Sequence, residues 1–274
     1  MTDLIHPRHR GSIYWSAFLG LLERDVRVLR RQFLPFLVRT VMNPILFVFV
    51  FAYVFPRIGQ GISGAGHAAS FATVLVPGLV AVGMIFQGIA AVALPLVNEI
   101  GRTKEIEDRL MAPVPIRLVA LEKIVFGSLQ SVLAAAVVFP LVYLIPATDV
   151  EVHIRNPVLL VVVICLGGLI SGAFGLVIGA SFRPQQVPLI FSIIVIPTTF
   201  LGCVYYPWSS LAVIRWLQVL VLLNPLVYIS EGLRAALTPD VPHMPVAAIL
   251  VAQLTVLATL VWLGLRAFLR RVID

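Results

Sequence analysis

The chain has 274 residues, of which 60% are hydrophobic and only 12% carry a formal charge, about half the charged fraction of an average soluble domain. This composition excludes an ordinary soluble protein, because a soluble core cannot enclose so much apolar surface. The net charge is +7, and the basic residues cluster in short segments between apolar runs. We therefore expect an integral membrane protein whose basic segments contact membrane lipid and not nucleic acid.

The first predicted element is an amphipathic helix over residues 12–37. Phe18 and Leu22 fall on one side of such a helix, while Arg24 and Arg27 fall on the other. This pattern is typical of a helix that lies in the interface at the cytoplasmic face of a membrane. It serves either as a plain topological anchor or as a helix that contacts a cytoplasmic partner or gates substrate entry from the inner leaflet.

Six apolar runs are long enough to cross a bilayer, since a helical span needs about 20 residues. We place the spans near residues 39–56, 72–97, 119–145, 157–181, 187–204 and 245–267. With this arrangement 16 of the 20 Lys and Arg residues fall on one side, which the positive-inside rule assigns to the cytoplasm. Both termini are then cytoplasmic, and residues 1–274 form a single all-α transmembrane domain.

The middle of each predicted span is free of Asp, Glu, Lys and Arg. An ion-coupled carrier needs such residues for its ion or proton sites, so the pattern disfavours secondary transport. In the fourth span, small residues recur at intervals of three and four, which permits close contact between helices. These residues are Gly168, Gly172, Gly175 and Gly179. The contact lies either within one subunit or between two subunits.

The loop between the second and third spans, residues 98–117, carries equal numbers of acidic and basic residues, whereas the other cytoplasmic segments are basic. It has the pattern of a short capped helix: a threonine cap, acids in the first turns, an arginine that can pair back, and two prolines that end it. Such a helix suits docking to a protein, although any loop between spans carries charge because it faces water. The residues of this pattern are Thr103, Glu105, Glu107, Arg109 and Pro113.

A further apolar segment, residues 208–237, is predicted to enter the outer leaflet and turn back. A full crossing would place the basic C-terminal residues outside, against the positive-inside rule, and Pro225 removes a backbone donor in its middle. Glu231 and Arg234 either form an ion pair in a partly dehydrated site or both face the outside water. The candidate gate residues are Asn224, Pro225, Tyr228, Glu231 and Arg234.

Two stretches resemble the ABC type-2 exporter permeases. The segment from Gly101 to Pro113, with Glu107 and Leu110, resembles the cytoplasmic coupling helix of that family. The segment 201–211, followed by 223–237, resembles the region before its last span. Together, and in the right order within a six-span chain, they cover nearly the whole protein.

The resemblance implies that the chain is the permease half of an ATP-driven exporter. Its partners would be two copies of an ABC ATP-binding subunit and a second permease copy, either identical or different. The resemblance assigns coupling to the ATPase to Thr103, Glu105, Glu107, Arg109, Leu110 and Pro113. The chain contains no G-x-x-x-x-G-K-[ST] motif, so ATP and Mg²⁺ would be used by the partner. We expect no catalytic residue, cofactor or metal site in this chain.

The apolar spans favour a hydrophobic or amphiphilic cargo, a drug or a lipid-like molecule, exported from the cytoplasm or the inner leaflet. A lipid-linked glycan or polysaccharide is the alternative cargo. Two other classes compete with transport, a membrane-embedded lipid-modifying enzyme and a scaffold. Against the enzyme, the sequence has no HExxH motif and no pair of carboxylates within the spans. In every case we expect a multi-pass protein of the inner (plasma) membrane.

Overall fold

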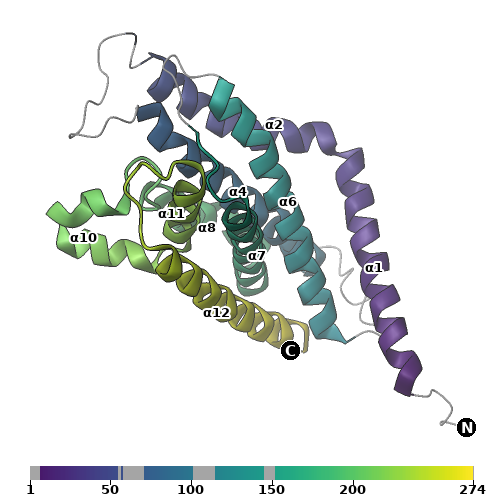
Figure 1. Cartoon of the computed structure of the whole chain (residues 1–274). Coiled ribbons are helices and arrows are strands. Elements are labelled where there is room, and N and C mark those ends of the chain that lie inside the picture. Colours follow the sequence, from purple (N-terminus) through teal and green to yellow (C-terminus); the bar gives the residue numbers. More distant parts are fainter. Residues whose placement is uncertain (1–6, 55–56, 58–70, 101–114, 145–151, 274) are drawn as a thin grey trace, which may run out of the picture.

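The computed structural model describes residues 7–54, 57, 71–100, 115–144 and 152–273. These residues are 88% helical and contain no strand, which confirms the predicted all-α class. Figure 1 shows the long helices packed side by side in one bundle, with the N-terminal helix α1 (Pro7–Arg31) along one side of it.

Four of the predicted spans are present as helices that are long and apolar enough to cross a membrane. They are α4 (Phe71–Asn98), α6 (Ile116–Leu144), α7 (Pro157–Ser181) and α12 (Val246–Ile273). Helix α7 begins where its sequence provides a cap. The Asn156 side chain accepts a hydrogen bond from the Leu159 amide at 3.1 Å, and Pro157 occupies the first turn.

Helix α4 lies at the centre of the bundle and packs against α6, α7 and α11 (Pro225–Leu237). In its most apolar stretch 83% of the residues are buried, against 11% in the corresponding stretch of α12. Both helices are apolar, so the difference reflects their positions. Helix α4 is enclosed by other helices, whereas α12 presents most of its apolar surface outward, as expected of a helix at the lipid-facing edge.

The first and fifth predicted spans are shorter or interrupted. Helix α2 (Phe33–Val48) continues into a π-helical turn, η1 (Phe49–Val54). The fifth run is divided into η3 (Pro184–Gln186), α8 (Val187–Ile190), η4 (Phe191–Val195) and α9 (Ile196–Phe200). Pro197 stands in the first turn of α9, and a proline lacks the amide that an unbroken α-helix requires. That these two segments cross a membrane stays a prediction.

Helix α1 ends at Arg31 and α2 begins at Phe33, whereas we predicted a single helix over residues 12–37. Pro35 accounts for the break. Its nitrogen cannot donate to the carbonyl of Arg31, as a continuous helix would require, and proline is well tolerated in the first turn of a new helix. That α1 lies along a membrane surface stays a prediction.

The helix termini define two ends of the bundle. At the loop end, where α4 ends and α6 begins, α12 also meets α7 (Figure 1), because Arg271 donates to the carbonyls of Ala180 and Phe182 at 3.2 and 2.5 Å. At the opposite end α11 ends beside the start of α7, where the His153 amide donates to the Leu237 carbonyl at 2.9 Å. We call this second end the re-entrant end.

Between α9 and α12 the chain folds into short helices. They are η5 (Trp208–Val213), α10 (Arg215–Leu220), η6 (Val221–Leu223) and α11. The chain direction changes by 99° between the 215–223 and 225–237 arms, at the Asn224-Pro225 step. Helix α10 lies at the edge of the bundle (Figure 1), while α11 is buried within it.

Candidate functional site

The bend that precedes α11 is made by Asn224 and Pro225. Pro225 occupies the first position of the helix, where a backbone amide has no hydrogen-bond partner within the helix, so its missing amide costs nothing. The Asn224 Oδ1 accepts a hydrogen bond from the Leu226 amide at 3.0 Å, and its Nδ2 donates to the Thr198 carbonyl at 2.7 Å. One side chain therefore caps α11 and ties it to α9.

Nearly two turns into α11, Glu231 and Arg234 form a fully buried ion pair. Arg234 Nη1 lies 2.5 Å from Glu231 Oε1, and both side chains are 0% exposed. Of the two alternatives left open by the sequence, pairing and exposure to water, the structure has the pair. Removing either partner would leave an uncompensated charge in a dry site, which is costly.

Three separate segments bind to this ion pair. Glu231 accepts hydrogen bonds from the Trp208 amide at 2.9 Å and from the Met244 amide at 2.8 Å. Arg234 Nη2 donates to the Cys203 carbonyl at 3.0 Å. The pair therefore fastens Cys203, Trp208 at the start of η5, and the chain before α12 to α11. We call Glu231, Arg234 and these backbone partners the α11 cluster.

Cys203 has a backbone φ of 52°, the one positive value among the described non-glycine residues. That left-handed conformation is uncommon for a residue with a side chain and persists only where surrounding contacts hold it. Here the contact is the hydrogen bond from Arg234 to its carbonyl. Sequence reasoning did not predict this backbone conformation.

Tyr228 completes the fastening of the bend. Its hydroxyl donates to the Leu222 carbonyl at 2.6 Å, across the bend itself. Its own carbonyl accepts a hydrogen bond from the Gln253 side chain of α12 at 3.1 Å. All five candidate gate residues thus belong to one hydrogen-bonded region at the re-entrant end.

A second buried ionic cluster lies at the loop end. Lys123 of α6 pairs with Asp25 of α1 at 2.8 Å and with Glu99, directly after α4, at 3.2 Å. The side chains are 3%, 11% and 12% exposed. We call these three residues the loop-end cluster, and it joins three helices that are far apart in the sequence.

Sequence reasoning did not single out this cluster. The signal that could have revealed it is Asp25, which stands three residues after Leu22 and four before Leu29. An acid on the apolar face of an amphipathic helix is costly unless a cation meets it. The basic partner on α6 could not be found from periodicity alone, because nothing local links Lys123 to α1.

The predicted coupling residues fall outside the described part of the chain. They are Thr103, Glu105, Glu107, Arg109, Leu110 and Pro113. The loop-end cluster brackets this segment, since Glu99 precedes residue 101 by two positions and Lys123 follows in the second turn of α6.

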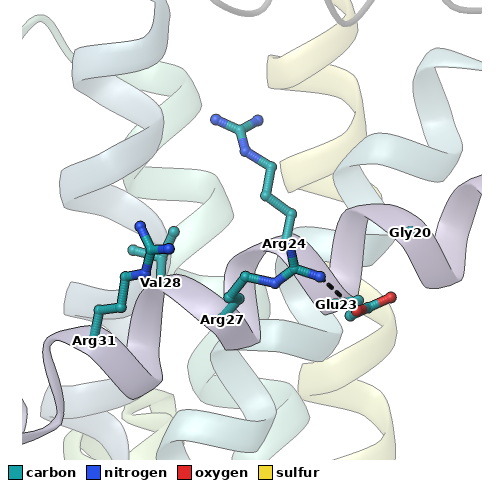
Figure 2. Close-up of a pocket in the computed structure, with 6 residues that line it drawn as sticks. All are labelled: Gly20, Glu23, Arg24, Arg27, Val28 and Arg31. Carbon is teal, nitrogen blue, oxygen red and sulfur yellow. Dashed lines mark hydrogen bonds and ion pairs between the residues drawn. The ribbon is translucent and has the colours of Figure 1, made fainter.

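The basic face of α1 lies next to the loop-end cluster along the same helix. Figure 2 shows its side chains, with Arg27 joined to Glu23 at 2.7 Å. These two side chains are 66% and 71% exposed, so their pair is weak compared with the buried ones. The shallow surface hollow there is lined by Gly20, Glu23, Arg24, Arg27, Val28 and Arg31.

The four glycines of the fourth predicted span all face neighbouring helices of the same chain. A Cβ added at Gly172 would overlap the Ile124 carbonyl of α6, and one at Gly168 would lie 2.7 Å from the Ser128 hydroxyl. Toward α4, a Cβ at Gly175 would lie 2.9 Å from the Ile89 carbonyl. A Cβ added at Gly179 would lie 3.1 Å from the Ala93 Cα, also on α4. The glycines thus permit α7 to pack closely on two helices at once.

A comparison with known families decides the class of this helical bundle. The profile of the ABC-2 type transporter family matches residues 16–238, from within α1 to the residue after α11. The chain belongs to the ABC-2 type transporter family. The inner membrane transport permease YadH of Escherichia coli K12 is 24% identical over 258 residues, which cover 91% of this chain and 94% of YadH.

YadH from Escherichia coli O157:H7 and YadH from Shigella flexneri match this ABC-2 protein at the same identity and coverage. No solved structure matches the chain. Family membership and several long apolar helices make the protein a multi-pass transport permease of the inner membrane, and a transport subunit in place of an enzyme.

Proposed function

We propose that this ABC-2 permease is the membrane subunit of an ATP-driven exporter that moves a hydrophobic or amphiphilic molecule outward from the cytoplasm or inner leaflet. Two separate ATP-binding subunits would hydrolyse ATP with Mg²⁺ beneath two permease copies. The observation that carries the proposal is the loop-end cluster, because Lys123 joins the helices on both sides of the 101–114 segment to α1.

The loop-end cluster suits the transmission of a push. Separating Lys123 from either acid would leave a charge unpaired in a site that is largely closed to water, at a cost of several kcal/mol. Helices α4, α6 and α1 would therefore move together when an ATPase displaces the segment between Glu99 and Lys123. The predicted coupling helix, with Glu107 and Arg109, is in this proposal the surface that the ATPase contacts.

The α11 region would close the outer end of the pathway. Tyr228, near the start of α11, is bonded to Gln253, which lies seven residues into α12, or about 10 Å along the helix. The end of α11 meets the start of α7. Both ends of α11 thus belong to the re-entrant half of the bundle, in keeping with a segment that enters the outer leaflet and returns.

The membrane topology follows from the same arrangement. With α2 and the 184–200 run as the two further crossings, six spans place both termini and the loop end in the cytoplasm. Lys123, Arg183 and Arg271 then stand at the cytoplasmic edge, as the positive-inside rule requires. A cysteine introduced at Ala212 should react with an impermeant reagent from outside intact cells, whereas one at Thr103 should not.

The decisive experiment measures association with an ATP-binding subunit. In membranes that carry both proteins, Glu107→Ala and Arg109→Glu should reduce co-purification of the ATPase or its substrate-stimulated ATP hydrolysis, while the permease still inserts. The matched control is Arg215→Ala, an exposed basic residue of α10 near the re-entrant end, which should change neither. Unchanged association and unchanged stimulation in both loop variants would contradict the coupling role.

The same preparation separates the alternatives. A lipid-modifying enzyme or a scaffold would not stimulate ATP hydrolysis by any associated subunit. A lipid-linked glycan exporter would respond to glycolipid in place of drug-like amphiphiles. Two differently tagged permease copies that co-purify would indicate a homodimer, and exclusive recovery of a second, different permease chain would indicate a heterodimer.

A further inference from the structure

About one helical turn from the loop-end cluster, a hollow of about 270 Å³ lies where α1 and α2 meet α4 and α6. Arg39 of α2 and Gln130 of α6 line it, together with Phe36, Phe126 and Pro95. A smaller hollow next to it is lined by Arg39 again and by Gln87 of α4. We call the first of these the Arg39 hollow.

Two buried amides mark the wall between the hollows. Gln87 Nε2 donates to Gln130 Oε1 at 3.0 Å, and the two residues are 3% and 7% exposed. Whichever way the two amides are oriented, their single mutual bond leaves donors and an acceptor over. Buried amides in an apolar bundle are stable only when their remaining groups also find partners.

The cation beside them has no counter-ion in the chain as described. Arg39 makes no ion pair or hydrogen bond with any residue of the described ranges. A guanidinium presents five donors in a planar fork, which matches the two oxygens of a phosphate or carboxylate. The hollow therefore offers one positive charge and an amide donor at the same place.

Apart from Gln32, the rest of the wall is apolar. Phe36 and Phe126 are 4% and 7% exposed, and Ala90 is 4% exposed. Leu94 and Pro95 of α4 continue this surface. A hollow with a cationic corner and an aromatic and aliphatic wall is complementary to an amphiphile and not to a free ion, which would leave the apolar wall facing water.

The depth of the hollow fits such a ligand. Arg39 is six residues from the start of α2, and Gln130 is seven residues beyond Lys123 at the loop end. Each distance is about 10 Å of helix. That places the cation within reach of the inner headgroup region, where long basic side chains extend toward the interface.

We propose that the Arg39 hollow binds one amphiphile with an anionic head, the phosphate or carboxylate on Arg39 and Gln130, and the apolar part along Phe126 and Pro95. The site narrows the cargo of the proposed exporter to anionic amphiphiles, and in that respect it rests on the proposed function. The same chemistry belongs to a resident anionic phospholipid. Binding itself requires no ATPase, so it can be tested separately.

The binding test uses the purified permease in nonionic detergent, titrated with phosphatidylglycerol or with phosphatidylcholine and followed by native mass spectrometry. We expect about tenfold tighter binding of the anionic lipid to the wild type. Arg39→Gln should abolish that preference, Arg39→Lys should keep part of it, and the control Arg215→Gln should keep all of it. Equal binding of both lipids by the wild type, or an unchanged preference in Arg39→Gln, would overturn the proposal.

Two further measurements keep the result interpretable. Arg39 lies on the surface of the chain, so Arg39→Gln should unfold at the same temperature as the wild type. Gln130→Leu removes the amide and leaves the charge of Arg39 in place. It should therefore weaken anionic-lipid binding less than Arg39→Gln does. Equal losses in the two variants would contradict the assignment of the head to Arg39.

The source of the amphiphile is decided in the permease–ATPase complex. If the ligand is cargo, anionic amphiphile should stimulate ATP hydrolysis by the wild type and by the control Arg215→Gln, and not by Arg39→Gln. If Arg39→Gln loses lipid binding but keeps stimulation, the hollow holds a resident lipid and the cargo assignment is overturned. A complex that never forms would defeat the proposed function while leaving the binding result in force.

Discussion

The two buried ionic clusters of this permease differ in how much of the chain they join. Glu231 and Arg234 are three residues apart on one helix and are completely closed to water. Lys123 reaches Asp25 and Glu99, 98 and 24 residues away, and its acids remain slightly exposed. The first cluster fixes the shape of one bent segment, whereas the second links separate helices.

This difference has a physical consequence. The partners of the α11 cluster are mostly backbone groups of neighbouring segments. The cluster therefore holds these segments in one arrangement and cannot shift without losing its hydrogen bonds. The loop-end cluster consists of three side chains on three elements, each of which can move with its own helix. A connection of the second kind is what a device for transmitting motion needs.

The largest effect is expected from Glu231→Ala. It leaves Arg234 charged in a dry site and removes the acceptor of the Trp208 and Met244 amides, which should cost about 3–5 kcal/mol. Equilibrium unfolding in mixed detergent micelles measures this loss. Glu231→Gln, which keeps one acceptor oxygen, should lose less, and a loss below about 1 kcal/mol in the alanine variant would remove the contrast between the clusters.

Lys123→Met should cost less stability than Glu231→Ala but should weaken the association of α1 with α6 more. The two acids remain next to each other without a cation, but they are 11% and 12% exposed and can be reached by water. We expect about 2–3 kcal/mol in the same unfolding assay. Glu231→Gln is the comparison, because it should disturb stability without affecting the association of α1 with α6. Cross-linking between cysteines on α1 and α6 checks that association.

Packing between the two clusters is tested by Gly172→Ala. The added methyl group overlaps the Ile124 carbonyl, and forcing α7 away from α6 should cost about 1–3 kcal/mol. The matched control is Gly20→Ala in α1, where a Cβ meets nothing within 4 Å. The control should be neutral or slightly stabilising because alanine is the better helix former. Equal behaviour of the two variants would contradict the close contact.

The smallest effect is expected from Arg27→Ala. Its ion pair with Glu23 is exposed to solvent on both sides, and pairs of this kind contribute about half a kcal/mol or less. The variant therefore provides the baseline for an ion pair outside the clusters. A loss comparable to that of Lys123→Met would show that burial does not distinguish them.

Much of the architecture could be predicted from local sequence. Long apolar runs gave the helices α4, α6, α7 and α12, and Asn224-Pro225 marked the bend before α11. The pairing of Glu231 with Arg234 was one of two open alternatives, since residues three apart on a helix meet regardless of the rest of the fold.

What sequence reasoning missed depends on contacts between distant segments. Periodicity places Asp25 on a face of α1 but does not say which helix that face meets. The left-handed backbone of Cys203 follows from the position of Arg234, 31 residues away. The Arg39 hollow is likewise formed where α2, α4 and α6 meet, so nothing in the local sequence shows that its polar residues lie together.

The most direct test exchanges the charges of the loop-end cluster. In the permease–ATPase complex, Asp25→Lys and Lys123→Asp should each abolish substrate-stimulated ATP hydrolysis. Asp25→Lys places a second cation beside Lys123, and Lys123→Asp places a third acid beside Asp25 and Glu99. The double variant restores an opposite pair and should recover most of the stimulation. Wild-type stimulation in both single variants, or no recovery in a folded double variant, would contradict the role of the loop-end cluster in coupling.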